Sequence, residues 1–261
     1  MKKKLVFAFY LGKNFKDEII EIHLKCIERF SNVFDEAEIA FIVDDDHNKA
    51  DLLYAQERLI KAFLGKKITF SFFKNGPYRE SIVFKEIIAD RLSSEDLVFF
   101  AHSKGMSNVE KYDREQIYVW VSAMYYYSLN FMDEVDRNLL NEKYYSYGPF
   151  LTKNNEPEKC NKYGWYYIGT FFWINCKKLW QYMQNNEIPL PKMGDRFYDE
   201  EFLGNIIPTW PLVFTASHGT RYLIDCKDYY HNAKDYLLSL HNSDIDGFKE
   251  FYKSLGLIWK D

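Results

Sequence analysis

Polar side chains that could do chemistry follow apolar runs at four places along the chain. These places are residues 10–13, 44–46, 102–105 and 217–221. The run before His102 is short, continuous and apolar, which is typical of a strand buried on both faces. Open α/β sheets bind their ligands beyond the carboxyl ends of such strands. Each cluster is therefore a candidate site, and an ordinary polar turn is the alternative interpretation.

The acidic cluster could recognise a nucleoside. A carboxylate of Asp44 or Asp45 can accept hydrogen bonds from a base or a ribose, and Tyr10, at the end of the first apolar run, could line the same pocket. A solvated turn or a helix N-terminus, where acids are favoured, is an equally good explanation of these carboxylates. A packed surface position is the alternative for Tyr10.

The basic residues could meet a phosphate. Lys104 can hold a phosphate as a point charge, and Gly105 allows a backbone to approach closely. Arg221 and His218, after a late apolar run, could converge on the same anion. Arg79 is a weaker candidate, because a surface position explains it better.

A third set of residues could supply a general base. Asp199, Glu200 and Glu201 stand at the opening of an expected short helix. The i, i+4 spacing lets Arg196 pair with Glu200, which would fix the rotamer of Glu200 and keep it ionised. An ionised carboxylate can take a proton from a hydroxyl group. An ordinary surface pair is the alternative, and Asp199 also suits a helix start.

Large aromatic rings could stack on a sugar. Trp165 and Trp173 lie in an aromatic run, and Trp165 follows a polar segment, so it is the better candidate for a sugar platform. Gly169 would allow a substrate to approach the backbone closely. Core packing is the alternative interpretation, and we favour it for Trp120, which lies on the apolar stripe of a helix.

The first hundred residues predict an alternation of strands and helices. Expected strands cover residues 4–10, 38–43, 67–73 and 97–101, and expected helices cover about 15–30, 50–64 and 78–92. This order implies right-handed crossovers and a largely parallel sheet. The first three polar clusters should then lie at one edge of that sheet.

The second half of the chain is less regular. Expected helices cover about residues 113–135, 177 onward, 197–207 and 245–255, and expected strands cover 144–151, 165–175 and 210–216. The segments around 153–163 and 189–194 read as loops because they carry Pro, Asn and Gly. Without repeats or a linker, we expect a single domain over residues 1–261.

Composition excludes some classes of protein. A net charge of −4 argues against a nucleic-acid-binding protein, and no run is long and apolar enough to span a membrane. The four cysteines form no Cys-x-x-Cys pair, which fits reduced thiols in the cytoplasm and gives no zinc signal. Aromatic residues reach 19%, and rings with a polar edge suit sugars and nucleobases.

Four motifs in order resemble one family. Val43-Asp44-Asp45-Asp46 looks like the Val-Asp-Asp-Gly of GT-A-type glycosyltransferases. Three further stretches are similar to motifs of bacterial surface-polysaccharide (capsule or lipopolysaccharide) enzymes of this type: Phe100-Ala-His-Ser-Lys-Gly105, Tyr167-Ile-Gly-Thr-Phe-Phe-Trp173 and Arg196-Phe-Tyr-Asp-Glu-Glu-Phe-Leu-Gly204. The resemblance covers about residues 4–222, and the last forty residues show no match.

The resemblance implies a GT-A-like, Rossmann-like α/β fold and transfer of a sugar from a nucleotide-diphosphate donor to a glycan or lipid-linked acceptor. Together with the positions after the strands, it predicts donor binding by residues up to about 105, including Tyr10, Asp44, Asp45, His102, Lys104 and Gly105, and by Arg221. Residues from about 106 would bind the acceptor through Trp165, Gly169, Trp173 and Arg196. It also favours Glu200 as the base over Asp199 and Glu201.

In one respect the sequence differs from the family pattern. The usual Asp-x-Asp, which holds a divalent metal against the donor diphosphate, is replaced by His102-Ser103-Lys104. Dependence on Mn²⁺ or Mg²⁺ therefore stays open, with His218 and His102 as the candidate ligands. We expect a cytoplasmic location, with peripheral association at the inner face of the membrane left open. The alternative functions are a catalytically silent nucleotide- or glycan-binding protein and a nucleotidyltransferase.

Overall fold

The computed structural model describes most of the chain. The described residues are 1–11, 17–45, 49–95, 97–103, 113–140, 144–153, 165–167, 169–194, 198–207, 213–215, 233–239 and 244–260.

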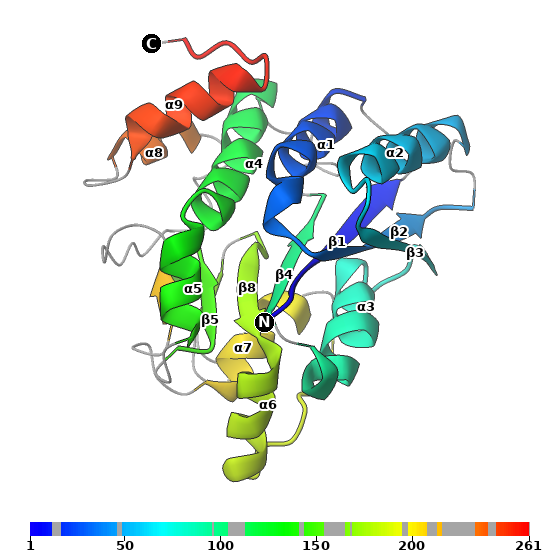
Figure 1. Cartoon of the computed structure of the whole chain (residues 1–261), viewed down its shortest axis with the longest axis vertical. Coiled ribbons are helices and arrows are strands. Elements are labelled where there is room, and N and C mark those ends of the chain that lie inside the picture. Colours follow the sequence, from blue (N-terminus) through cyan, green and yellow to red (C-terminus); the bar gives the residue numbers. More distant parts are fainter. Residues whose placement is uncertain are drawn as a thin grey trace.

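The described part alternates strands and helices in its first hundred residues, as the sequence predicts (Figure 1). The elements there are β1 (Lys3–Leu11), α1 (Asp17–Phe30), β2 (Glu36–Val43), α2 (Lys49–Ala62), β3 (Lys67–Lys74), α3 (Glu80–Val83) and β4 (Leu97–His102). The helix that begins as α3 continues through one wide π-helical turn, Phe84–Ile88, and a tight 3₁₀ stretch, Ala89–Ser94.

The later elements are shorter. They are α4 (Arg114–Leu129), α5 (Met132–Leu140), β5 (Ser146–Gly148), β6 (Leu151–Lys153), β7 (Trp165–Tyr167), β8 (Phe172–Asn175), α6 (Cys176–Asn185), α7 (Tyr198–Ile206), β9 (Val213–Thr215), α8 (Ala233–Ser239) and α9 (Ile245–Ser254). No described helix combines the length and the apolar character that crossing a membrane requires.

One mixed, mostly parallel sheet organises these elements. Its described strands run in the order β3-β2-β1-β4-β8-β5-β9, and a separate two-stranded sheet pairs β6 with β7. The first four strands of the order are mutually parallel. β8 is antiparallel to both β4 and β5, and β9 is parallel to β5. The expected α/β class is confirmed.

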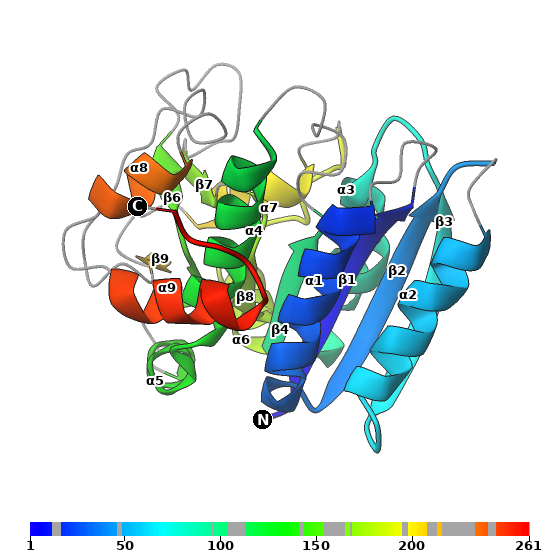
Figure 2. The same ribbon diagram turned by 90° about the horizontal axis from the view of Figure 1, so that it is seen from above.

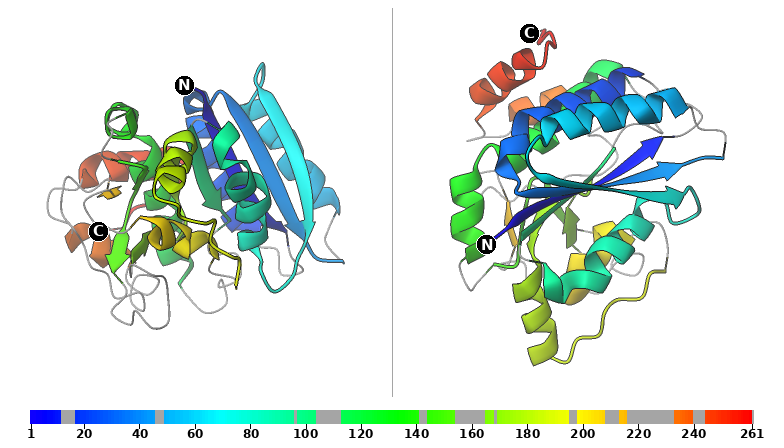
Figure 3. Two further views of the ribbon diagram at one scale, coloured as in Figure 1. Left: turned by 90° about the horizontal axis from the view of Figure 1, so that it is seen from below. Right: turned by 45° about the vertical axis from the view of Figure 1, so that its right-hand side comes forward.

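Alternating side chains of the strands build one core on each face of the sheet. On β1, Leu5, Phe7 and Phe9 pack on one face, and Val6 and Ala8 pack on the other. Helices α1, α2 and α4 cover the first face, and α3, α6 and α7 cover the second. Figures 2 and 3 show these helical layers on the two sides of the sheet. Because helices cover both faces of the central strands, these strands can meet a ligand at their ends.

The expected long helix over residues 113–135 is two helices. α4 ends at Leu129, and α5 begins at Met132 after a bend at Asn130 and Phe131. Acidic residues favour a helix N-terminus, and Asp133 and Glu134 occupy the first turn of α5. Apolar periodicity alone does not register such an interruption.

The two expected strands over residues 144–151 and 165–175 are also divided. Phe150 has a φ of 52° between β5 and β6, and Gly169 and Thr170 have φ of 81° and 58° between β7 and β8. Backbone in the left-handed region cannot continue a strand. The chain therefore passes from the large sheet to the small one and returns. Helix α8 had no counterpart among the expected elements.

Candidate active site at the carboxyl edge of the sheet

The described residues of three polar clusters, Tyr10, Asp44 and His102, lie at the carboxyl ends of β1, β2 and β4, at one edge of the sheet. These three strands are parallel neighbours, with Tyr10 paired to Ile42 and Ala8 paired to His102 in the register. Ser103 fastens the end of β4 to β1, because its Oγ accepts a hydrogen bond from the Tyr10 N–H at 2.8 Å. The strand ends are thus held together before any ligand binds.

Asp44 is held in place, whereas Asp45 is solvated. The half-buried Asp44 carboxylate accepts a hydrogen bond from Tyr10 Oη at 3.0 Å and one from Asn75 Nδ2 at 2.7 Å. Asp45 forms an exposed ion pair with Lys74 at 2.9 Å. These two hydrogen bonds fix the position of the Asp44 carboxylate at the end of β2.

His102 lies at the end of β4 and is only 6% exposed. Its Nε2 is 3.0 Å from the carbonyl oxygen of Gly169, and its Nδ1 is 3.5 Å from Glu80 Oε1. Sequence reasoning missed Glu80, because it lies beyond the turn after β3 and not directly at the strand end. Each of the other strands in the alternating half is followed by polar residues. The same pattern after β3 is the sequence signal that could have indicated Glu80.

The turn before α3 has an unusual backbone. Arg79 has φ 46° and ψ −130°, and the Ser81 N–H donates to Tyr78 O at 3.0 Å. This is the geometry of a type II′ turn, whose first central position favours glycine. The exposed guanidinium of Arg79 forms no hydrogen bond or ion pair with any residue in the described part of the chain.

Asp199 is a buried acid on the second face of the sheet. It is 1% exposed, and its Oδ1 accepts a hydrogen bond from Ser81 Oγ at 2.6 Å. Its Oδ2 has no hydrogen-bond partner among the described residues. Burial raises the pKa of the Asp199 carboxyl well above its usual range, and the nearby carboxylates of Glu80 and Glu200 raise it further. The site therefore favours the neutral, protonated form of Asp199.

Glu200 is half-buried and is connected to His102 through the turn between β7 and β8. The Thr170 Oγ1 donates to Glu200 Oε1 at 3.4 Å, and Thr170 follows Gly169, whose carbonyl contacts His102. Glu201 is also half-buried and presents a different side of α7. The structure thus brings Glu80, His102 and Glu200 into one connected arrangement.

Two tryptophans expected at the acceptor side lie in the core. Trp165 is 1% exposed and donates its Nε1–H to Ile207 O at 3.1 Å. Trp173 is completely buried and donates to Ser128 O at 2.9 Å. A buried ring has no free face on which a sugar could stack, so we correct the expectation of a sugar platform at either position.

Gly169 occupies a turn whose backbone conformation favours glycine. A Cβ atom at this position would lie 2.0 Å from Met124 Cε, and the φ of 81° disfavours any other residue. Packing against Met124 and the turn conformation therefore explain this glycine, and close approach of a substrate is not needed to explain it.

Five of the predicted site residues lie outside the described residues: Lys104, Gly105, Arg196, His218 and Arg221. Among the residues that the structure describes, no three side chains of His, Cys, Asp or Glu converge in a way that could hold a metal ion. The donor set around His102, one carboxylate and one carbonyl, does not make a metal site by itself. We therefore derive no chemical step through a metal.

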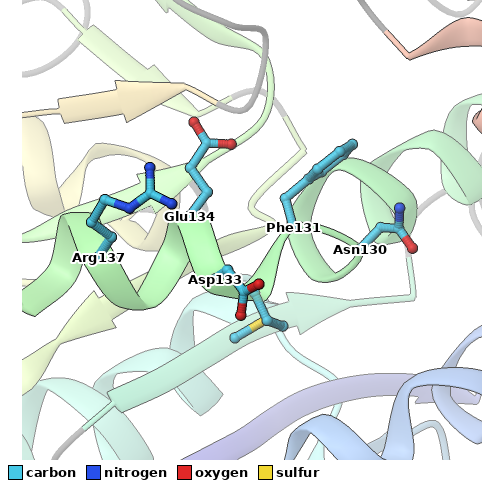
Figure 4. A pocket seen from close by; sticks show the side chains of 6 residues that line it. Asn130, Phe131, Asp133, Glu134 and Arg137 are labelled. Carbon is cyan, nitrogen blue, oxygen red and sulfur yellow. The ribbon is translucent and has the colours of Figure 1, made fainter.

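A hollow lies at the bend between α4 and α5, with a volume of about 540 Å³. Figure 4 shows the residues that line it: Asn130, Phe131, Met132, Asp133, Glu134 and Arg137. Asp136 of α5 pairs at 2.7 Å with Lys3, at the amino end of β1. The hollow is therefore near the opposite edge of the sheet and contains none of the predicted site residues.

Comparison with models of protein families gave no match, and comparison with curated proteins gave none either. Solved structures similar to this chain include the following three. Mouse xyloside xylosyltransferase 1 is 8% identical and has a TM-score of 0.39, with 95% of this chain and 93% of that chain covered. The 4-diphosphocytidyl-2C-methyl-D-erythritol synthase of Anaerococcus prevotii is 13% identical and has a TM-score of 0.37, with coverages of 90% and 99%. Core-mannan synthase A of Aspergillus fumigatus, in an Mn/GDP form, is 9% identical and has a TM-score of 0.34, with coverages of 82% and 72%.

These structures include glycosyltransferases, the class that the sequence motifs resemble. At TM-scores below 0.5 they carry no argument about the activity of this chain.

Proposed function

We propose that this chain transfers a sugar from a nucleotide-diphosphate donor to a hydroxyl group of an acceptor. The observation that carries the proposal is the connected arrangement of Glu80, His102 and Glu200 beside the held carboxylate of Asp44. Sugar transfer needs a group that recognises the nucleoside, a positive charge near the diphosphate and a base for the acceptor. Residues of these kinds surround one edge of the sheet.

The donor would lie across the carboxyl ends of β2, β1 and β4. Asp44 accepts a hydrogen bond from the base or the ribose, with Tyr10 fixing the position of its carboxylate. The diphosphate lies toward His102 and the predicted phosphate-binding residues Lys104 and Gly105. A leaving diphosphate gains negative charge, so donors and cations placed there lower the barrier to its departure.

Glu200 is the proposed base. As the acceptor oxygen bonds to the anomeric carbon, its proton passes to the Glu200 carboxylate. The bond from that carbon to the diphosphate oxygen breaks, and the nucleoside diphosphate leaves with the electron pair. This step inverts the anomeric centre. Asp199 is a poor base, because burial keeps its carboxyl protonated.

The acceptor side rests on the sequence resemblance. That resemblance favours a glycan or lipid-linked acceptor in surface-polysaccharide synthesis, with Arg196 beside the base. Trp165 and Trp173 are buried. Contacts with the acceptor sugar must therefore come from exposed residues near Glu200.

Glu200→Gln tests the base directly, because it keeps the shape of the side chain and removes its basicity. We expect transfer to fall by about two to four orders of magnitude, the usual contribution of a general base. Affinity for the nucleoside diphosphate should be unchanged. Glu201→Gln, next to it on the same helix, is the matched control and should keep most of the activity. Near-normal transfer by Glu200→Gln would contradict the assignment.

The same assay separates the alternative functions. A wild-type chain that binds nucleoside diphosphates but neither hydrolyses nor transfers any sugar from a panel of donors is a binding protein. Release of pyrophosphate from a nucleoside triphosphate and a sugar phosphate identifies a nucleotidyltransferase.

A further inference from the structure

Each ring nitrogen of His102 lies near an atom that only accepts hydrogen bonds. Nε2 is 3.0 Å from a backbone carbonyl oxygen, that of Gly169. Nδ1 is 3.5 Å from a carboxylate oxygen, that of Glu80. The imidazole ring is nearly buried, so bulk water does not compete freely for either nitrogen.

This arrangement decides between the protonation states of the ring. A neutral imidazole has one N–H and one bare lone pair, and only the imidazolium has an N–H on both nitrogens. With Nε2–H donating to Gly169 O, a neutral ring would turn the lone pair of Nδ1 toward the negative charge of Glu80. Protonation of Nδ1 replaces that repulsion with an ion pair.

The surrounding charges act in the same direction. Glu80 comes from α3, and Glu200 comes from α7 through Thr170, which it contacts at 3.4 Å. Asp199, also from α7, is held neutral by burial and adds little negative charge. The guanidinium of Arg79 is exposed to water, which screens its effect on the ring.

The turn at Arg79 explains how Glu80 reaches this position. A non-glycine residue with φ 46° and ψ −130° stores conformational strain, and such residues cluster at functional sites. Here the strained residue directly precedes Glu80. Ser81, the next residue, donates to the buried Asp199, which fastens the start of α3 to α7.

We propose that Glu80 is a positioning residue that holds His102 as an imidazolium, so that the carboxyl edge of the sheet has a built-in positive charge. Its ligand is an anionic diphosphate, and this part of the proposal rests on the proposed function.

The protonation state can be measured without any ligand. In protein labelled with ¹⁵N at histidine, the His102 signals are assigned from their loss in His102→Gln. At a pH above about 6.5, the ordinary value for histidine, both ring nitrogens of His102 should have the shifts of protonated nitrogen. In Glu80→Gln, only Nε2 should remain protonated. A bare Nδ1 in the wild-type chain would overturn the proposal, as would an imidazolium that survives in Glu80→Gln.

The ligand is tested by calorimetric titration of the same proteins with UDP, GDP, CDP and ADP and with the matching nucleosides. Glu80→Gln should weaken binding of the preferred nucleoside diphosphate about tenfold, which is the contribution of one hydrogen bond to a charged group. Binding of the nucleoside should not change. Glu86→Gln is the matched control, because Glu86 pairs with Lys85 on the exposed side of the same helix.

The outcomes separate this inference from the proposed function. Equal diphosphate affinity in the wild-type chain and in Glu80→Gln overturns the role of the charge and leaves the transferase proposal standing. Failure of the wild-type chain to bind any nucleoside diphosphate overturns the transferase proposal and the ligand assigned to His102. The histidine spectra still decide whether Glu80 sets the charge of the ring.

Discussion

Asp199 and Glu200 are neighbours in the sequence, but the fold gives their carboxyl groups different surroundings. Asp199 is buried between α7 and the start of α3, and Ser81 donates to it. Glu200 is half-buried and reaches the turn that contacts His102. Two carboxyl groups in such different environments can hold different protonation states at one pH, which is how neighbouring acids take different roles.

The buried acid makes stability depend on pH in a defined direction. Because the folded chain holds the pKa of Asp199 above its unfolded value of about 3.9, the group stabilises fully only below that value. This stabilisation is lost as the pH rises toward the folded pKa. In Asp199→Asn nothing ionises at this position. The thermal midpoint of the variant should therefore rise relative to that of the wild type as the pH increases above about 4.

Thermal unfolding followed by circular dichroism across that pH range checks this prediction. Glu201→Gln, which alters an acid on the same helix without removing a buried one, is the control. A constant difference between Asp199→Asn and wild type at every pH would mean that Asp199 is not a buried acid with a raised pKa.

Arg79 occupies a position where glycine would be more stable. Relief of a strained backbone is worth roughly 1–3 kcal/mol, and the extra freedom of an unfolded glycine offsets roughly 0.5–1 kcal/mol of it. Arg79→Gly should thus raise the free energy of unfolding by about 1 kcal/mol in urea denaturation. Arg79→Lys keeps the strain and the charge, and should change nothing. A less stable Arg79→Gly would show that the arginine side chain itself stabilises the turn.

At the scale of secondary structure, the turn between β7 and β8 connects the halves of the site. Its carbonyl at Gly169 contacts His102 from one side, and its hydroxyl at Thr170 contacts Glu200 from the other. The strands on either side pair with different sheets, β7 with β6 and β8 with β4 and β5. The turn therefore connects the small sheet to the large one.

A comparison of two glycines with almost the same φ separates the effect of packing on stability from the effect of backbone conformation at Gly169. Gly169 has φ 81° and a Cβ there would meet Met124, whereas Gly65 has φ 79° and open space around it. Gly65→Ala should lower the free energy of unfolding only by the cost of placing alanine in the left-handed region. Gly169→Ala should lose at least about 1 kcal/mol more, because an added methyl group in a packed core forces its neighbours to shift. Equal losses in urea denaturation would contradict the packing argument.

At the scale of the whole molecule, the sequence predicted the first half well. The expected strands 38–43 and 67–73 lie within β2 and β3, because short apolar runs between turn signals leave little choice of structure. Their alternation with helices then implied the parallel order and the shared edge for Asp44 and His102.

The second half was predicted less well, for physical reasons. Apolar periodicity does not detect a residue with positive φ such as Phe150. It therefore predicts two continuous strands where the structure has divided ones. It also does not show which aromatic ring ends in the core, and Trp165 was placed wrongly for that reason. The link from Glu80 to His102 joins α3 to β4 across the fold, and no local pattern encodes such a contact.

The central claim is that a nucleotide-diphosphate sugar binds at the carboxyl edge of the sheet. Its most direct test is a crystal structure of the chain with the nucleoside diphosphate that binds most tightly in the titrations. We predict that the base or ribose lies within hydrogen-bond distance of Asp44 and the diphosphate beside His102, with space for a sugar between His102 and Glu200. A diphosphate bound elsewhere, for example in the hollow beside α5, would contradict the account.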